Sequence, residues 1–179
     1  MTSPTRERIL DALVAVVAQD GPAGATLDAV AAAAGVSKGG LLYHFGTKEA
    51  LFDGLVERLT RLAREDVAQW RDHDEGVVPA YLRASTIAQG PYTSTLLAVL
   101  RLVGTSGVEV EGAVLESFEA WFGALADAID DPVLARMIHL VGDGLYLHAL
   151  VGARPHPLDE EVVRRLIEFA TTPEAVPRA

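Results

Sequence analysis

The chain has 179 residues, a net charge of −10, an apolar content of 50% and no cysteine. This length suits one ordinary domain or two small ones that share a core, and the composition excludes a disordered chain, a disulfide scaffold and thiolate chemistry. The N-terminus lacks the apolar core of a secretory signal, and the longest apolar run, residues 96–103, is too short to span a bilayer. We therefore expect a cytoplasmic protein without a membrane partner.

The first predicted helix covers residues 6–20, where apolar residues recur with a period of 3.6. The sequence GPAG at residues 21–24 ends it. A short helix follows over Leu27–Ala34, and the Thr26 hydroxyl can cap it by accepting a free backbone N–H. Gly35 ends this helix, because only glycine turns left-handed there without steric cost.

A second short helix begins after a Ser37 cap and extends to about Phe45. Ala31 is small where the two helices cross, and Leu41 is placed to fill their shared core. This spacing of small, glycine and aliphatic residues indicates a helix-turn-helix, which makes DNA the first partner to consider.

A longer helix capped by Thr47 follows, to about residue 71, and further periodic segments predict helices over 78–88, 92–103, 109–129, 132–151 and 158–170. The chain is thus predicted to be all-α, with about nine helices. We expect residues 1–46 to form a DNA-binding domain and residues 47–179 a helical effector-binding and dimerisation domain, with the helix over 47–71 as the connector. Residues 171–179 are expected to fray.

The helix-turn-helix residues resemble those of the TetR family of one-component transcriptional regulators. The resemblance rests on Thr26, on the sequence GVSKGGL at residues 35–41, on YHF at 43–45 and on KEAL at 48–51. It implies a homodimer that binds a palindromic operator and releases it when a small molecule enters the C-terminal domain.

A recognition helix places its N-terminal residues against base edges in the major groove. Here those residues are Ser37, Lys38, Gly39 and Gly40. Lys38 can donate to guanine or to a phosphate. The two glycines favour close approach of the helix to DNA, although a loose helix that becomes ordered on DNA is an equal interpretation.

The resemblance implies phosphate contacts from Thr26, Tyr43, His44 and Lys48, whose side chains can all donate to anionic oxygens. Each has a plainer alternative: Thr26 and Ser37 as caps only, Tyr43 packed on the third helix, His44 as a surface histidine and Lys48 solvated.

The sequence departs from the family pattern at two positions, and its charge sets a further limit. Leu42 stands where the family often has an aromatic residue, so it can make an apolar DNA contact but no hydrogen bond. Asp28 stands where a basic residue often faces DNA, and its carboxylate would repel phosphate.

Residues 1–59 carry five Lys/Arg against seven Asp/Glu, and residues 60–179 carry ten against eighteen. We therefore expect modest non-specific affinity for DNA.

The last two predicted helices are expected to form the dimer interface, because the helix over 132–151 is apolar on more than one face. Gly142 and Gly144 would allow close backbone approach there. The alternative is a helix central to a monomeric core. The candidate interface residues are Leu134, Ile138, Val141, Leu145, His148 and Leu166.

An apolar or amphipathic small molecule is the expected effector, and its candidate contacts are Phe118, Trp121, Phe122, Met137 and Tyr146. The alternative is that these residues are ordinary core. His139 and Asp143 are four residues apart, as in some zinc sites, but without an evident third ligand a hydrogen-bonded pair is favoured. We expect no metal, no cofactor and no enzymatic activity, because no catalytic motif is recognisable.

The sequence therefore predicts a homodimeric, ligand-responsive transcriptional repressor. Two alternatives stay open. One is a constitutive DNA-binding protein without an effector. The other is a helical small-molecule-binding protein or enzyme with a vestigial helix-turn-helix.

Overall fold

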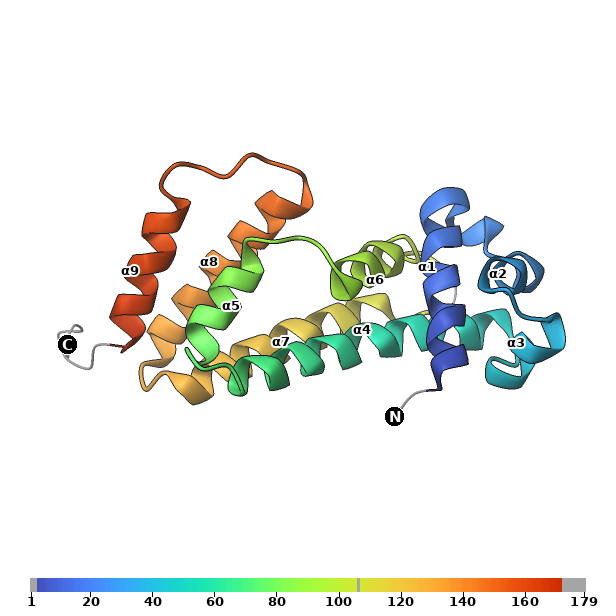
Figure 1. Cartoon of the computed structure of the whole chain (residues 1–179), viewed down its shortest axis with the longest axis horizontal. Coiled ribbons are helices and arrows are strands. Elements are labelled where there is room, and N and C mark those ends of the chain that lie inside the picture. Colours follow the sequence, from blue (N-terminus) through green and yellow to red (C-terminus); the bar gives the residue numbers. More distant parts are fainter. Residues whose placement is uncertain (1–2, 106, 172–179) are drawn as a thin grey trace. The chain divides into compact units, whose positions relative to one another are not determined.

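The computed structural model describes residues 3–105 and 107–171, and these residues form nine helices and no strand (Figure 1). The all-α fold that the sequence predicts is confirmed. Of residues 171–179, where fraying is expected, Thr171 is the last residue of α9 and donates its hydroxyl to the Ile167 carbonyl oxygen, and the others lie outside the described residues. The helices are α1 (Pro4–Gly24), α2 (Leu27–Ala34), α3 (Lys38–His44), α4 (Lys48–Arg71), α5 (Val77–Ser85), α6 (Pro91–Leu100), α7 (Val110–Ala128), α8 (Pro132–Leu150) and α9 (Asp159–Thr171).

The chain divides into two compact units. The N-terminal unit comprises residues 1–62 and 90–117, and the C-terminal unit comprises residues 63–89 and 118–179. The long helices α4 and α7 each contribute residues to both units. None of the helices in residues 3–105 and 107–171 has the length and apolar character that a membrane span requires.

Local hydrogen bonds fix the ends of α2 and α3 as the sequence predicts. The Ala29 N–H donates to Thr26 Oγ1 at 3.1 Å, and the Gly40 N–H donates to Ser37 Oγ at 3.0 Å. Between the helices, Gly35 has a φ of 63° and a ψ of 36°, which is the left-handed conformation that ends α2. The helix-turn-helix is therefore confirmed as a local structure.

The core of the N-terminal unit joins α1, α2, α3 and the first half of α4. Leu41 of α3 is fully buried, as are Leu10 of α1, Val30 of α2 and Leu51 of α4. Phe45, which follows α3, is also buried, and its ring lies over α4 at Gly54. A β-carbon at that glycine would lie only 2.5 Å from the ring, so this residue has no room for a side chain.

Three helices end three or more residues away from the predicted position. Gly21 has a φ of 71° and interrupts α1, but the helix resumes for one turn to Gly24. Helix α5 ends three residues early at Ser85, where the N–H groups of residues 86 and 87 bond to carbonyls three residues back. Helix α6 ends at Leu100 in the same way, because a tight turn with three-residue hydrogen bonds replaces its last predicted turn.

In the C-terminal unit, α5 packs against both α8 and α9. The closest approach is at Gly142 of α8, where a β-carbon would overlap the ring of Tyr81 from α5. The close approach expected at Gly142 is thus made to the same subunit, whereas Gly144 has open space around its α-carbon. The Tyr81 hydroxyl donates to the His139 carbonyl oxygen at 2.9 Å and ties the two helices together.

Candidate functional site

One face of α3 is exposed and the other is in the core. Lys38, Gly39, Leu42 and Tyr43 are exposed, whereas Leu41 is buried. Tyr43 is 86% exposed, so it does not pack on another helix. Of the residues predicted to read bases, Lys38 and Gly39 therefore lie on the outward face of α3, whereas Gly40 is half-buried and its N–H donates to Ser37 Oγ.

The two glycines of α3 differ in their surroundings. A β-carbon at Gly40 would lie 3.2 Å from Ser37 Oγ, so this glycine leaves room for the capping hydroxyl. A β-carbon at Gly39 would meet no atom within 4 Å. Packing within the protein therefore does not require glycine at residue 39.

Lys38 is paired within the helix-turn-helix. Its ammonium group donates to Asp28 Oδ2 at 2.9 Å, and both side chains are more than half exposed. Such a surface ion pair contributes about 0.2–1 kcal/mol, so it can be exchanged for a phosphate or a base. Asp28 thus lies beside the recognition helix and neutralises the charge that Lys38 would bring to DNA.

Lys48, at the first residue of α4, is half-buried rather than solvated. Its ammonium group donates to the Pro22 carbonyl oxygen at 2.8 Å and lies 5.2 Å from the centre of the Phe52 ring. The Thr47 hydroxyl caps the same helix by accepting the Ala50 N–H. These contacts hold a cation next to the N-terminus of α4.

The other predicted phosphate contacts lie close to α3. The Tyr43 ring meets the half-buried His44 ring edge-on, with 5.2 Å between the ring centres. Thr26 and Ser37 are exposed while their hydroxyl oxygens cap α2 and α3, and a capping hydroxyl keeps its own proton for another acceptor.

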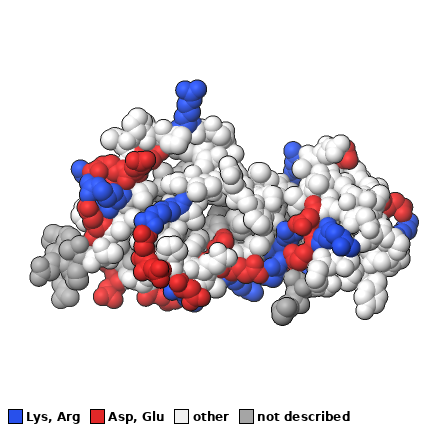
Figure 2. Space-filling view, in the orientation of Figure 1, with Lys and Arg blue, Asp and Glu red and all other residues white. Residues whose placement is uncertain are grey.

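Charged side chains are few over α2 and α3 in the view of Figure 2, whereas acidic side chains gather around α9 and around the loop after α4. This distribution follows the sequence, which concentrates the acidic residues after residue 59. An uncharged surface beside a recognition helix agrees with modest non-specific affinity.

Three of the five predicted effector contacts belong to an aromatic cluster in the C-terminal unit. Phe118 lies 5.9 Å from Trp121, and Trp121 lies 6.1 Å from Trp70, measured between ring centres. Phe122 lies 5.6 Å from the ring of His139. Met137 is 54% exposed and Tyr146 is half-buried.

His139 is buried in this cluster and makes polar contacts along its own helix. Its Nδ1 accepts a hydrogen bond from Arg136 at 2.7 Å and lies 3.7 Å from the Asp143 carboxylate. Burial lowers the pKa of His139 and raises the pKa of Asp143. Arg136 can only donate, so Nδ1 accepts and the ring is neutral, with its proton on Nε2.

The aromatic cluster around His139 does not have the arrangement of ligands that a metal ion requires. His139 and Asp143 form a close pair, but in residues 3–105 and 107–171 no group of three His, Asp or Glu side chains is placed to hold an ion.

Helix α8 has two neighbouring apolar stripes. One packs into its own subunit and the other is exposed. Of the predicted interface residues, Ile138 is fully buried in its own subunit, Leu134, Val141 and Leu145 are half-buried, and His148 is exposed. Leu166 of α9 is also half-buried. The most exposed apolar side chains of α8 lie one position earlier, at Val133, Met137, Leu140 and Leu147.

Sequence reasoning missed the non-local partners of these residues. Trp70 and Tyr81 complete the aromatic cluster, with 5.4 Å between their ring centres, but they come from α4 and α5. Asp66 of α4 is half-buried, and burial raises its pKa to about 6. Helical periodicity places such residues on an inward face but does not reveal what they contact there.

Two family models match the chain. The model of bacterial regulatory proteins, tetR family, matches residues 9–55, and the model of the tetracyclin repressor-like C-terminal domain matches residues 75–171. The second match covers more than half of the chain by itself. No curated protein matches the sequence significantly.

Solved structures match over nearly the whole chain. A member of the TetR family (SCO1917) from Streptomyces coelicolor A3 is 28% identical, with a TM-score of 0.66 over 92% of this chain and 98% of the other. The multidrug binding protein EbrR complexed with malachite green is 29% identical, with a TM-score of 0.64 over 94% of this chain and 98% of the other. Salmonella enterica GusR is 20% identical, with a TM-score of 0.64 over 96% of this chain and 99% of the other, and it supports the fold alone.

Proposed function

Because the chain belongs to the TetR family of bacterial regulatory proteins, and is therefore a DNA-binding transcription regulator, we propose that it is a homodimeric repressor. In this proposal the dimer binds a palindromic operator, and a small molecule releases it. It acts in the cytoplasm, and no catalytic step is part of the proposal.

The exposed face of α3 is the observation that carries the DNA-binding part of this proposal. Lys38, Leu42 and Tyr43 are exposed on this face, Tyr43 the most at 86%, whereas Leu41 is buried and holds the helix in the core. The bare backbone at Gly39 favours close approach to base edges. The Tyr43 hydroxyl and the ammonium group of Lys48 donate hydrogen bonds to neighbouring phosphates. These contacts fix the register of the helix on the duplex.

The dimer is proposed to form through the outward faces of α8 and α9. On α8 the exposed apolar residues Val133, Met137, Leu140 and Leu147 are spaced by four, three and seven residues, which is a heptad spacing, and Gly144 lies in the same row. On α9, Val162 and Phe169 are exposed and lie seven residues apart. A second copy would cover both rows, with the predicted residues Leu134, Val141, His148 and Leu166 at the flanks.

Release by an effector is supported by the relatives of known structure. EbrR is a multidrug binding protein whose structures hold imidazole, ethidium and malachite green. By analogy, we propose that this chain also takes an apolar or amphipathic organic molecule in its C-terminal unit. Release then requires that the ligand bind better to a spacing of the recognition helices that does not fit successive major grooves.

Selection of bound fragments from random duplex DNA tests the DNA-binding function. We expect an inverted repeat with half-sites about one helical turn apart. Replacement of Tyr43 by alanine should then weaken binding to the selected site without changing the unfolding midpoint, because Tyr43 is almost wholly exposed. Failure to enrich any sequence at low salt would overturn the proposal and favour a vestigial helix-turn-helix.

Sedimentation analysis of the L140R variant tests the dimer. A charge in the middle of the outward row of α8 should convert a dimer into a folded monomer that no longer protects both half-sites. Arginine at Ile87, which is exposed on the loop after α5, is the matched control and should leave the dimer intact. A wild-type chain that is monomeric at micromolar concentration would contradict the proposal.

A further inference from the structure

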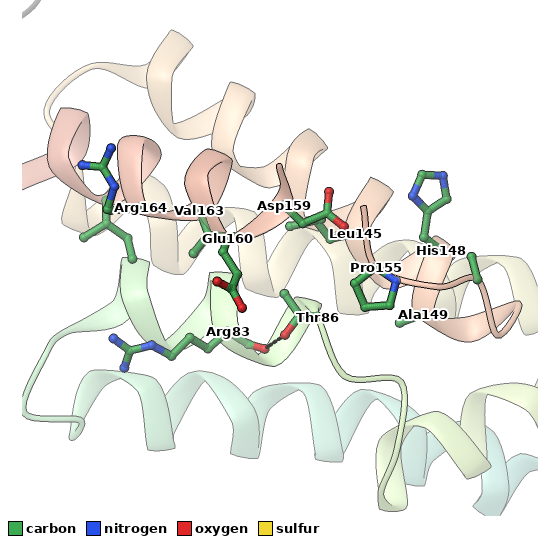
Figure 3. Close-up of a pocket in the computed structure, with 12 residues that line it drawn as sticks. Arg83, Thr86, Leu145, His148, Ala149, Pro155, Asp159, Glu160, Val163 and Arg164 are labelled. Carbon is green, nitrogen blue, oxygen red and sulfur yellow. Dashed lines mark hydrogen bonds between the residues drawn. The ribbon is translucent and has the colours of Figure 1, made fainter. Parts of the chain in front are cut away.

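A cavity of about 520 Å³ lies within the C-terminal unit, between α5, α8, α9 and the loop that joins α8 to α9 (Figure 3). Its volume is in the range of pockets that hold small organic ligands. None of Phe118, Trp121, Phe122, Met137 and Tyr146 lines it. It is therefore separate from the effector contacts that the sequence predicts.

The wall of this cavity is mainly apolar. Leu145 and Ala149 of α8, Val163 and Ile167 of α9, and Pro155 of the connecting loop line it. Leu145, Val163 and Ile167 are only half-buried, so the protein itself leaves part of their apolar surface uncovered. An apolar group in the cavity would cover that surface and gain about 25 cal/mol per Å² removed from water.

The charged groups around the cavity leave carboxylate in excess. Arg83 pairs with Glu75, and Arg164 pairs with Glu161 at 2.7 Å and with Glu168. In Figure 3 both guanidinium groups point away from the Glu160 carboxylate, which extends from α9 toward Thr86 on α5.

The two lining carboxylates, Asp159 and Glu160, differ in their partners. Asp159 Oδ2 accepts the His156 N–H at 2.7 Å. Within the part of the chain that the structure describes, the Glu160 carboxylate forms no ion pair or hydrogen bond. The arginines are thus neutralised, and the charge left to meet a ligand is negative.

We propose that this cavity binds an amphipathic organic monocation, with its apolar body against Leu145, Val163 and Ile167 and its positive charge beside Glu160. The residues that line the cavity include no Phe, Tyr or Trp ring for a cation–π contact, so the carboxylate supplies the charge recognition. A role for this site in releasing DNA rests on the proposed function, whereas binding itself does not.

The cavity is placed to influence the outward rows of α8 and α9. Leu145 and Ala149 face the cavity, whereas Met137, Leu140 and Leu147 of the same helix are exposed on the outside. A ligand bound between α5 and α9 would therefore change the position of α9 without contacting these outward residues. It would meet the proposed dimer surface only at its flank, through His148, which also lines the cavity.

Calorimetric titration with tetraphenylphosphonium and tetraphenylborate tests the proposal, because these ions match in size and shape and differ in the sign of their charge. We expect the phosphonium ion to bind once per subunit and at least about tenfold more tightly than the borate, the ratio that corresponds to 1.4 kcal/mol. Equal binding of the two ions, or binding of neither, would overturn the proposal.

Variants locate the site. Glu160→Gln should weaken phosphonium binding about fivefold and leave borate binding unchanged or stronger, whereas Asp74→Asn, the same charge change on the exposed loop after α4, should alter neither. Ala153→Trp, at an exposed loop residue that lines the cavity, should abolish binding of the phosphonium. Phosphonium binding that both Glu160→Gln and Ala153→Trp leave unchanged would place the ion elsewhere and contradict the proposal.

A gel shift on the selected operator separates the binding site from its regulatory role. Release of DNA by the phosphonium, lost in Glu160→Gln, supports both. Phosphonium binding without release supports the site and rejects its role as the effector site. Absence of operator binding contradicts the proposed function alone, because the calorimetric result does not depend on DNA.

Discussion

The two units differ in how far their candidate functional groups are shielded from water. In the N-terminal unit the functional candidates Thr26, Ser37, Lys38 and Tyr43 are exposed, and their hydrogen bonds join residues close in sequence. In the C-terminal unit His139 is buried and Asp66 and Asp143 are half-buried, and burial shifts the pKa of each. A surface that reads DNA needs donors that can change partners, whereas a unit that responds to a ligand can store free energy in groups shielded from water.

Gly142→Ala tests whether the C-terminal unit depends on close packing. A β-carbon there overlaps the Tyr81 ring, whose hydroxyl is hydrogen-bonded and cannot swing away freely. We expect the free energy of unfolding in urea to fall by about 2–3 kcal/mol, as for other overpacked cores. Gly123→Ala, in α7 with open space around its α-carbon, is the control and should be neutral or stabilising. Equal stability of the two variants would show that the unit does not depend on the close packing of Tyr81 against Gly142.

Asp66→Asn tests whether burial of a charged carboxylate lowers the free energy of unfolding of the same unit. The pKa of Asp66 is raised to about 6, because burial and the nearby Glu65 both disfavour the charged carboxylate. The folded state thus holds the proton more tightly than the unfolded state, and this stabilisation is lost as pH rises through about 6.

The asparagine variant should therefore be more stable than the wild type by about 1 kcal/mol at pH 8, after solvent screening is allowed for. The gain should shrink as the pH is lowered toward the ordinary aspartate pKa. Urea unfolding at several pH values measures it, with Asp74→Asn as the exposed control. A gain that does not depend on pH would show that the pKa of Asp66 is not raised in the folded state.

Lys48→Ala tests the exchange of partners in the N-terminal unit. We expect binding to fall about fivefold on operator and unrelated DNA alike, and the salt slope to become shallower by about one unit. The loss is moderate because the free protein also loses the bond from Lys48 to the Pro22 carbonyl. Lys48→Met keeps the packing on Phe52 and separates charge from contact. An unchanged dependence of binding on salt concentration would show that Lys48 does not contact a phosphate.

Asp28→Asn should produce the smallest effect and in the opposite direction. It removes a negative charge beside the recognition helix and frees Lys38 from its ion pair. A surface ion pair of this kind contributes less than about 1 kcal/mol, so we expect DNA binding to strengthen two- to threefold. Glu111→Gln makes the same charge change on α7, outside the helix-turn-helix, and fluorescence anisotropy should detect no gain.

The helix-turn-helix could be predicted because its signals are local. Thr26, Gly35 and Ser37 each act on backbone groups within five residues, so the type of residue is enough to place the ends of α2 and α3. The burial of Leu41 followed from the same short-range geometry.

The C-terminal unit could be predicted only as a set of helices. Helix α8 is apolar on two adjacent stripes, and a rotation of one residue decides which stripe faces the subunit core. That choice depends on Tyr81 filling the space at Gly142, a contact between residues 61 positions apart. The same holds for the cavity beside Glu160, which exists only once α5, α8 and α9 have come together.

The open space at Gly39 has an evolutionary consequence. Codons for glycine are a single base change from codons for arginine, serine, aspartate and alanine. Since a β-carbon at residue 39 meets no neighbouring atom, such a change would add a side chain to the outward face of α3 without disturbing the core. After gene duplication, one mutation there could give a daughter protein a different operator preference while both copies keep the same fold.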